Sequence, residues 1–384
     1  MEITYAVLGS GMQGTCAAYD LAKFSGANQI KLGDMSLDQA SASAARVNRL
    51  VGREVCRPFQ VNARDAGSVS EFLADATTLL SCVPYYLHPA VARVAVETKT
   101  NMCDLGGNTD VTHETLALDS AAQAAGVTLV PDCGLAPGLV NSLATYLMEQ
   151  MDSTDTIRLY CGVLPQNPVP PFNYKVTFNV EGLVTEYDYK AIVLRDGEIA
   201  EVDTLDELEH FDDTPLGHLE AFTTSGGTST APYTFRGKLK NYEYKTFRFP
   251  GHAALMRVYK DFGLWREDEI EVKGTKVRPK DVFCQVFGEE LGKIKDRDQC
   301  VIRAIGLGEK DGEAVTRTID IHDLEDPETG FTSMERLTGF SLSIVAQHIT
   351  RSSSTRGALR YEMAMPGSDF VAAIRERGIQ LHER

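Results

Sequence analysis

The first part of the chain alternates short nonpolar runs with amphipathic segments of helical period. Nonpolar runs typical of buried strands cover residues 4–9, 29–34, 56–63, 77–83, 101–106 and 127–133. Helical patterns lie between them, at residues 12–24, 38–50, 68–74, 88–98 and 112–125. Short nonpolar strands separated by helices are typical of a parallel sheet that is covered on both faces. This pattern predicts an α/β fold with a doubly wound parallel sheet.

The pattern changes after about residue 151, where the strand-like runs become longer and alternate nonpolar with polar residues. These runs cover residues 156–164, 174–180, 191–202, 242–249, 300–309 and 313–323. Alternation favours an antiparallel or mixed sheet, and Asp196-Gly197 favours a hairpin turn. Helical patterns cover 253–262, the stretch from Met334, and 369–377. We therefore expect a second, α+β domain that follows the first.

These patterns give a two-domain organisation. We expect a dinucleotide-binding domain at residues 1–139, completed by C-terminal helices at 334–384 that return to it. We expect a substrate-binding and dimerisation domain at residues 140–333. A chain of 384 residues is long enough for two such domains.

Charge and cysteine content narrow the possible partners. The formal net charge of −16 argues against nucleic acid and against anionic membranes. The 8 cysteines form no C-x-x-C pair and show no metal-ligand spacing with histidine. This pattern predicts reduced thiols in a cytoplasmic protein, without a metal site. We also expect neither a signal peptide nor a membrane span, because no nonpolar run is long enough.

The sequence GSGMQG follows the first predicted strand and opens the first predicted helix, which favours a dinucleotide-binding turn. Gly9 allows a tight turn, Gly11 allows the backbone to approach a pyrophosphate, and Gly14 allows close packing of helix and strand. Asp34 ends the second strand, where a carboxylate binds the ribose 2′-hydroxyl and repels a 2′-phosphate. NAD is therefore expected rather than NADP. The predicted contacts of this turn and strand end are Gly9, Ser10, Gly11, Met12, Gln13, Gly14 and Asp34.

Ligands of open α/β sheets bind beyond the carboxyl ends of the strands. The residues at four further strand ends are therefore expected to line the cofactor. They are Asn62, Ala63, Ser81, Cys82, Val83, Pro84, Asp104, Leu105, Gly106, Cys133 and Gly134.

Several motifs resemble those of the saccharopine dehydrogenase-like family. In the first domain these are GSGMQG, VPYYLHPAV, CDLGG and DCGLAPGLVN. In the second, EGLVTEYDYKAIVLRDGE, LEAFTTSGGTST and YKTFRFPGH resemble the L-lysine 6-dehydrogenase branch. The resemblance runs over nearly the whole chain. It implies a Rossmann domain, a catalytic domain on a mixed sheet, a C-terminal return to the first domain and a homodimer.

Two departures bear on the substrate that the resemblance implies. Saccharopine reductases typically have an aspartate in GLDPG, where this chain has Ala136. Their Asn-Arg pair before Asp-Ser-Thr is also missing, because residues 225–227 are Ser-Gly-Gly. A lost arginine removes a group that could bind a second dicarboxylate. The departures favour lysine over saccharopine.

The resemblance implies NAD-dependent oxidative deamination of the ε-amino group of L-lysine. The product is 2-aminoadipate 6-semialdehyde, which cyclises to piperideine-6-carboxylate. Such a reaction needs a group that accepts the amine proton, and groups that orient the substrate. The base candidates are Asp104, Asp132 and His252. Arg248 is the candidate for the substrate carboxylate, because a guanidinium binds carboxylates bidentately. Tyr187 and Glu181 are candidates for the α-ammonium group, and Thr228 and Ser229 could supply hydroxyls.

Three alternatives remain open at this point. The first is a reductive condensation within the same family, of the saccharopine or carboxy(nor)spermidine dehydrogenase type. The second makes Cys133 the nucleophile of an aldehyde dehydrogenase, although no base stands beside it in sequence. The third is an NAD-binding sensor without catalytic activity.

Overall fold

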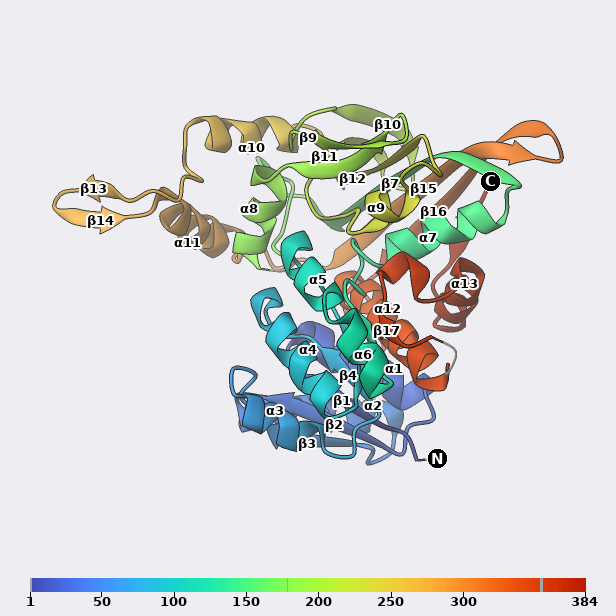
Figure 1. Cartoon of the computed structure of the whole chain (residues 1–384). Helices are drawn as coiled ribbons and strands as arrows, with labels where there is room; N and C mark the ends of the chain where they lie inside the picture. Colours follow the sequence, from blue (N-terminus) through green and yellow to red (C-terminus); the bar gives the residue numbers. More distant parts are fainter. Residues whose placement is uncertain (1, 178, 353–354) are drawn as a thin grey trace.

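The computed structural model describes residues 2–177, 179–352 and 355–384, and its lower half in Figure 1 is built on a seven-stranded sheet. The strand order is β17-β6-β5-β4-β1-β2-β3, and every pairing is parallel. This confirms the doubly wound sheet. The strands are β1 (Thr4–Leu8), β2 (Gln29–Asp34), β3 (Cys56–Gln60), β4 (Thr78–Ser81), β5 (Asn101–Asp104), β6 (Thr128–Val130) and β17 (Gly357–Ala358).

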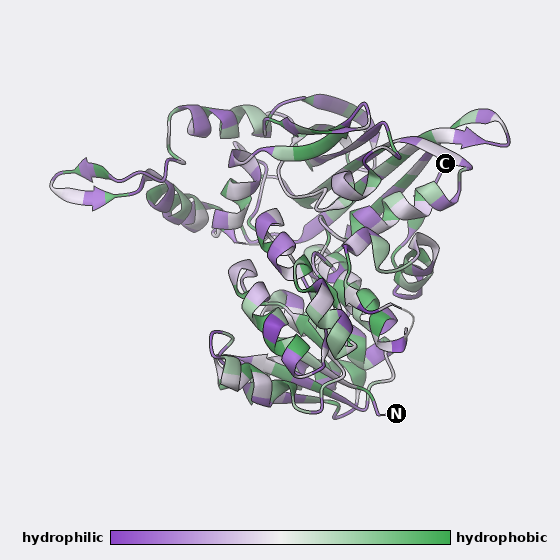
Figure 2. Ribbon diagram, viewed as in Figure 1, coloured by the Kyte–Doolittle hydropathy of each residue, from purple (hydrophilic) through white to green (hydrophobic). Residues whose placement is uncertain are grey.

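Helices cover both faces of this sheet. One face carries α1 (Met12–Phe24), α2 (Leu37–Val51) and α12 (Ser333–Arg351). The other face carries α3 (Ala66–Leu73), α4 (His88–Glu97), α5 (Thr109–Leu116) and α6 (Asp119–Ala125), with a short 3-10 turn η1 (Tyr85–Leu87) before α4. The single helix predicted at 112–125 is therefore two helices. In Figure 2 the helices of this half carry both purple and green turns, as expected when one face meets the sheet and the other meets water.

The second half is a nine-stranded mixed sheet in the order β10-β11-β12-β7-β15-β16-β18, with β8 paired to β12 and β9 to β8. Among the described residues, β12 and β7 are the only parallel neighbours in this sheet, so the expected mixed sheet is confirmed. The strands are β7 (Ser153–Pro165), β8 (Ala191–Arg195), β9 (Glu198–Val202), β10 (Glu209–Thr214), β11 (Gly217–Thr223), β12 (Asn241–Arg248), β15 (Asp298–Lys310), β16 (Glu313–Leu324) and β18 (Leu381–Glu383).

Helices and one small hairpin surround the second sheet. The helices are α7 (Leu139–Glu149), α8 (Val180–Asp188), α9 (Ala231–Phe235), α10 (His252–Asp261) and α11 (Pro279–Leu291). The hairpin of β13 (Ile270–Val272) and β14 (Thr275–Val277) projects from the body of the molecule beside α11, at the left of Figure 1. A second core of aromatic and aliphatic side chains, including Tyr187, Phe222 and Trp265, lies under α8, α10 and α11.

The C-terminal segment returns to the first sheet, as predicted, but it is divided between the two sheets. Helix α12 packs against α1, and β17 joins β6. After the turn η2 (Tyr361–Met363) and α13 (Gly367–Glu376), strand β18 instead pairs with β16 of the second sheet. A buried ion pair between Arg377 and Asp20, with Nε and Oδ1 2.7 Å apart, ties this end to α1. The domain limits stay a prediction.

One predicted strand is wrong. Residues 174–177 form no strand, residue 178 lies outside the described residues, and α8 begins at Val180. The nonpolar and polar residues of this segment alternate for another reason: successive side chains pack against different parts of the protein. The guanidinium carbon of Arg248 lies over the ring of Tyr174, 4.9 Å from the centroid of that ring. Thr177 lines a cavity.

None of the helices described in the structure combines the length and the hydropathy needed to cross a membrane.

Candidate active site

The turn between β1 and α1 has the shape that a dinucleotide requires. Gly9 has a φ of +98°, and a Cβ there would stand 2.6 Å from the carbonyl oxygen of Cys82. A Cβ on Gly14 would stand 1.8 Å from the carbonyl oxygen of Gly9. Gly11, in contrast, faces open space, since nothing lies within 4 Å of its built Cβ. Two glycines therefore hold the turn closed, and the third leaves its outer side open to a ligand.

The N-terminus of α1 offers hydrogen-bond donors at this open side. The first backbone hydrogen bond of the helix runs from Thr15 N–H to Gly11 O. The N–H groups before Thr15 therefore have no acceptor within the helix. The side-chain oxygen of Gln13 is buried without a hydrogen-bond partner. Donors at a helix N-terminus, together with the helix dipole, suit the phosphates of a dinucleotide.

Asp34 closes the same turn from β2. Its Oδ2 accepts hydrogen bonds from Ser10 N–H at 2.8 Å and from Ser10 Oγ at 3.0 Å, and its Oδ1 accepts one from Ser36 N–H at 3.1 Å. The side chain is half-buried, so the carboxylate remains reachable from solvent. The residues present at this turn therefore fit a dinucleotide.

The remaining strand-end residues divide into two groups. Those with exposed or half-buried surface, available to a ligand, are Gly9, Gly11, Met12, Gln13, Asn62, Ala63, Cys82, Val83, Pro84, Leu105 and Gly106. Ser10, Gly14, Ser81, Asp104, Cys133 and Gly134 are buried. Ser81 Oγ lies 3.1 Å from Nδ1 of His88, and Ser10 supports Asp34. We therefore correct the prediction for the side chains of Ser81, Asp104 and Cys133, which have no surface left for a cofactor.

A cavity of about 130 Å³ lies between the first sheet and the second. Its first wall comes from the strand-end loops of the first sheet and is nonpolar: Leu105, Gly134, Leu135, Ala136 and Pro137. Its second wall comes from β7, β12, the segment leading into α8 and α8 itself: Cys161, Val163, Tyr244, Thr246, Arg248, Thr177 and Glu186. Met334 and Thr338, one turn apart on α12, complete it. Residues two apart on β7 and β12 share this face, as the period of a strand requires.

Arg248 ends β12 and enters the second wall from a buried position, with 4% of its surface exposed. Its Nε donates to Tyr187 Oη at 2.9 Å, and its Nη1 donates to the carbonyl oxygen of Phe247 at 2.9 Å. Along the described chain no hydrogen bond is made by Nη2. The guanidinium is thus fixed by two partners and keeps one nitrogen for a ligand.

His252 and Tyr187 lie behind Arg248 and not at the cavity. His252 is 1% exposed, with Nε2 3.2 Å from Tyr187 Oη and Nδ1 3.3 Å from the carbonyl oxygen of Phe172. Burial, together with the Arg248 charge, lowers the pKa of His252 to about 3. Tyr187 is fully buried and accepts from Arg248. We therefore correct both predictions: this pair holds the guanidinium in place, and His252 is not poised as a base near neutral pH.

The acidic residue at the cavity is Glu186 and not Glu181. Glu181 is exposed in the first turn of α8, next to the N-cap Asn179. Glu186 lies further along the same helix and lines the cavity, half-buried. Burial raises the pKa of Glu186 to about 7, although the Arg248 charge opposes the rise. Sequence reasoning missed Glu186, because the helical pattern alone does not say which turn of α8 meets the cavity.

The loop with Thr228 and Ser229 joins the two halves of the molecule instead of lining the cavity. Ser229 Oγ donates to Oδ2 of Asp132, and Thr228 Oγ1 donates to the carbonyl oxygen of Ile192 at 2.8 Å. Asn141, on α7, donates to the carbonyl oxygen of Thr228 at 3.1 Å. The hydroxyls predicted for the substrate are therefore used within the protein.

Asp132 and Asp104 form a buried network next to this loop. Both oxygens of Asp132 accept from Thr112 Oγ1, at 3.0 Å each, and Asp104 Oδ1 accepts the N–H groups of Gly106 at 2.8 Å and Asp132 at 3.2 Å. Each aspartate residue has 2% of its surface exposed, and neither lines the cavity. The prediction that one of them is the base is not supported by this geometry, because a substrate cannot reach them.

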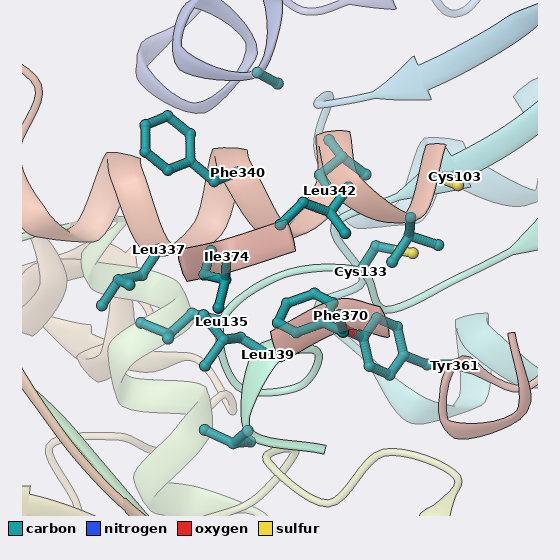
Figure 3. Packing of buried hydrophobic residues seen from close by; sticks show 14 of the residues in the cluster. Cys103, Cys133, Leu135, Leu139, Leu337, Phe340, Leu342, Tyr361, Phe370 and Ile374 are labelled. Atoms are coloured by element: carbon teal, nitrogen blue, oxygen red, sulfur yellow. The ribbon is translucent and has the colours of Figure 1, made fainter. Parts of the chain in front are cut away.

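Cys133 lies inside the core between the first sheet and the C-terminal helices, as Figure 3 shows with Cys103, Tyr361 and Leu342 around it. It is fully buried, and its Sγ contacts the carbonyl oxygen of Val130 at 3.3 Å. Burial raises the pKa of the Cys133 thiol well above its usual range. A buried thiol with a raised pKa is inert, so the nucleophile alternative loses its chemical basis.

Further cavity residues were missed by sequence reasoning, although one signal could have found two of them. Tyr244 and Thr246 precede Arg248 by four and two positions on β12, so strand alternation puts them on its face. Cys161 and Thr177 carry no comparable signal.

Comparison with known proteins agrees with this architecture. Residues 5–130 match the model of the saccharopine dehydrogenase NADP binding domain, and residues 134–379 match that of the saccharopine dehydrogenase C-terminal domain. The whole chain aligns with the structure of apo saccharopine dehydrogenase (L-Glu forming) from Saccharomyces cerevisiae, at a TM-score of 0.80 and 18% identity, covering 100% of this chain and 99% of the other. That likeness establishes a shared fold.

Proteins that are similar in sequence support the same family. The chain is 26% identical over 236 residues to the mitochondrial alpha-aminoadipic semialdehyde synthase of Bos taurus, and 23% identical over 263 residues to saccharopine dehydrogenase [NADP(+), L-glutamate-forming] of Pyricularia oryzae. The matches cover 57% and 66% of this chain, but only 25% of the bovine protein and 54% of the fungal one. Because the two domain models together account for most of its length, the chain belongs to the saccharopine dehydrogenase family.

Proposed function

We propose that the protein oxidises the terminal amine of L-lysine to an imine, with NAD as hydride acceptor, and that water then hydrolyses the imine to ammonia and 2-aminoadipate 6-semialdehyde. The observation that carries the proposal is the division of charge in the cavity. Arg248 and Glu186 belong to the wall of the second sheet, whereas the wall from the strand-end loops of the first sheet, the sheet that also carries the dinucleotide turn, is made of nonpolar residues. A substrate whose charged head binds Arg248 would therefore present an uncharged, distant carbon to the cofactor side.

The residues of the cavity would divide the work as follows. The free nitrogen of Arg248 would bind the substrate carboxylate, and its hydrogen bonds to Tyr187 and Phe247 would keep it oriented. Leu105 and Ala136 would surround the terminal amine. A nonpolar environment disfavours an ammonium ion, so it lowers the pKa of the bound amine and favours the neutral form that can be oxidised. The dinucleotide, when bound, supplies the hydride acceptor.

Two features bear on the choice of cofactor, and they point in opposite directions. The carboxylate of Asp34 at the ribose side would repel a 2′-phosphate, which favours NAD. The fungal relative, in contrast, is named as an NADP(+) enzyme. We favour NAD because Asp34 is already oriented by Ser10 and Ser36.

The second candidate is the L-glutamate-forming saccharopine reaction, which the name of the fungal relative favours. Saccharopine carries an additional dicarboxylate portion, which calls for further cations. Among the described residues that line the cavity, Arg248 is the only arginine or lysine. The cavity therefore suits lysine better.

The direct test is a spectrophotometric assay of the purified protein with L-lysine and NAD, without any 2-oxo acid. We expect reduced cofactor to form, faster at alkaline pH because more of the amine is neutral, and faster with NAD than with NADP. Parallel reactions contain saccharopine with each cofactor. Turnover of saccharopine without turnover of lysine would replace this proposal with the second candidate.

A further inference from the structure

Glu186 is a carboxylate that the protein leaves without a partner at the cavity. Over the described residues, its side-chain oxygens make neither a hydrogen bond nor an ion pair. Arg248 lines the same wall, but Tyr187 and the carbonyl oxygen of Phe247 hold the guanidinium, and no ion pair forms between the two side chains. A half-buried carboxylate that lines a cavity and has no partner within the described protein is available to a cationic ligand.

We propose that Glu186 binds the α-ammonium group of the substrate, so that the enzyme selects free α-amino acids among terminal amines. This inference rests on the proposed function. The α-carboxylate and the α-ammonium group of an amino acid are attached to one carbon. Their two receptors must therefore stand beside each other while remaining free of each other, which is the arrangement of Arg248 and Glu186.

The location of Glu186 also argues against a role as the base for the reacting amine. It belongs to the wall that carries Arg248, and the two charges are close enough to interact. The reacting carbon must instead approach the nonpolar wall of Leu105 and residues 134–137, which belongs to the domain that carries the dinucleotide turn. Binding at two points would fix the α-carbon at one wall and direct the methylene chain toward the other, which is how orientation contributes to rate.

The experiment compares Glu186→Gln with Glu181→Gln, a matched control on the exposed first turn of the same helix. The substrates are L-lysine, 6-aminohexanoate, which lacks the α-ammonium group, and cadaverine, which lacks the carboxylate. A hydrogen bond between charged groups contributes enough for wild type to prefer lysine over 6-aminohexanoate by about 10- to 100-fold in kcat/KM. Glu186→Gln should reduce this preference to about threefold or less, and Glu181→Gln should leave it unchanged.

The pH profile gives a second readout. Below about pH 7 Glu186 becomes neutral and loses its attraction for an ammonium group, since its pKa is raised to about 7. Protonation of the reacting amine lowers kcat/KM with decreasing pH in every case; we expect an additional, steeper fall below pH 7 for lysine in wild type, and this additional fall to be absent in Glu186→Gln and with 6-aminohexanoate. The other groups that face Glu186 are Arg248, Tyr174, Tyr187 and Tyr244, whose pKa values are raised above their usual range, so they do not titrate here.

Two outcomes separate this inference from the proposed function. If Glu186→Gln, with an unchanged melting temperature, keeps the wild-type preference for lysine over 6-aminohexanoate, the inference is overturned. If wild type oxidises none of the amines, the proposed function fails, and calorimetric titration of L-lysine into wild type and Glu186→Gln at pH 8 tests recognition alone. Equal affinities there would overturn the inference as well.

Discussion

Asp132 and Glu186 are two carboxylates whose pKa burial raises, but their surroundings differ. Burial is the main cause that raises the pKa of each to about 7. For Asp132, the Asp104 charge adds to the rise, while the hydroxyl groups of Ser229 and Thr112 oppose it. For Glu186, only the Arg248 charge opposes it. One carboxylate is thus saturated by hydroxyl donors, whereas the other meets the charge of Arg248 without a hydrogen bond or an ion pair.

The difference shows that a raised pKa does not by itself identify a functional acid. Perturbed pKa values gather at active sites, but structural networks produce them too. Asp132 holds the junction between the halves of the molecule, with a φ of +64° that non-glycine residues rarely adopt. Glu186 lines a cavity and lacks a partner in the described structure. Access to a ligand, and the absence of internal partners, distinguish the two.

The largest expected effect follows from removing the cation beside Glu186. Arg248→Met deletes the carboxylate receptor and leaves Glu186 without its opposing charge. Truncation of one member of a buried charge pair costs about 2–5 kcal/mol, which corresponds to roughly 30- to 4000-fold in kcat/KM for lysine. Cadaverine, which has no carboxylate, should lose much less. Steady-state kinetics with both amines measure the difference.

Arg236→Met serves as the control for this change, because the Arg236 side chain is 58% exposed and pairs with Glu198 at the surface. It should leave both kcat/KM values within about twofold of wild type, as expected for a surface ion pair. An equal loss with lysine and cadaverine in Arg248→Met would mean that the arginine supports the fold of the cavity and does not bind the carboxylate.

The second prediction concerns stability at the junction. The pKa of Asp132 is raised in the folded protein, so the folded state retains a proton that the unfolded state has lost between about pH 4 and pH 7. This group therefore makes the protein less stable as the pH rises through that window. Asp132→Asn removes the titration and keeps the shape. Relative to the variant, wild type should lose about 2 kcal/mol of unfolding free energy between pH 5 and pH 8, measured by urea denaturation.

Two further measurements sharpen the contrast with Glu186. Ser229→Ala removes a hydrogen bond that lowers the pKa of Asp132, so it should make the loss of stability with pH steeper. Asp132→Asn should leave the preference for lysine over 6-aminohexanoate as it is in wild type. If the unfolding free energies of wild type and Asp132→Asn change with pH in the same way, the Asp132 carboxylate has an ordinary pKa at the junction.

Local patterns in the sequence were enough to predict the first sheet and its dinucleotide turn. The GSGMQG turn and Asp34 lie at the ends of the first two strands, which are neighbours in the sheet. Ser10 of the turn donates two hydrogen bonds to Asp34. Arg248 was proposed because a guanidinium suits a carboxylate, and the structure places it at the end of β12, in the wall of the cavity. In these cases the residues that define the geometry lie close together in sequence.

The remaining assignments depended on contacts between residues far apart in sequence. Asp132 resembles a catalytic acid until Ser229, 97 residues away, is seen to donate to it. His252 resembles a base until Tyr187 and Phe172 surround it. Glu186 lies next to Tyr187 in a helical pattern that gives no sign of which side chain meets the cavity. Tertiary contacts decide which polar group is satisfied and which is left for a ligand.

The smallest expected effect comes from Cys133→Ala, at the strand end that the nucleophile alternative invoked. The side chain fills a fully buried position, so its truncation should destabilise the protein by about 1 kcal/mol through a small cavity. Cys284→Ala, on a half-buried position of α11, should change stability less. Because Cys133 touches no open surface, turnover of lysine should persist in Cys133→Ala. Loss of turnover with intact NAD binding would instead restore the thiol to the chemistry, and would require that the core around Tyr361 opens during the reaction.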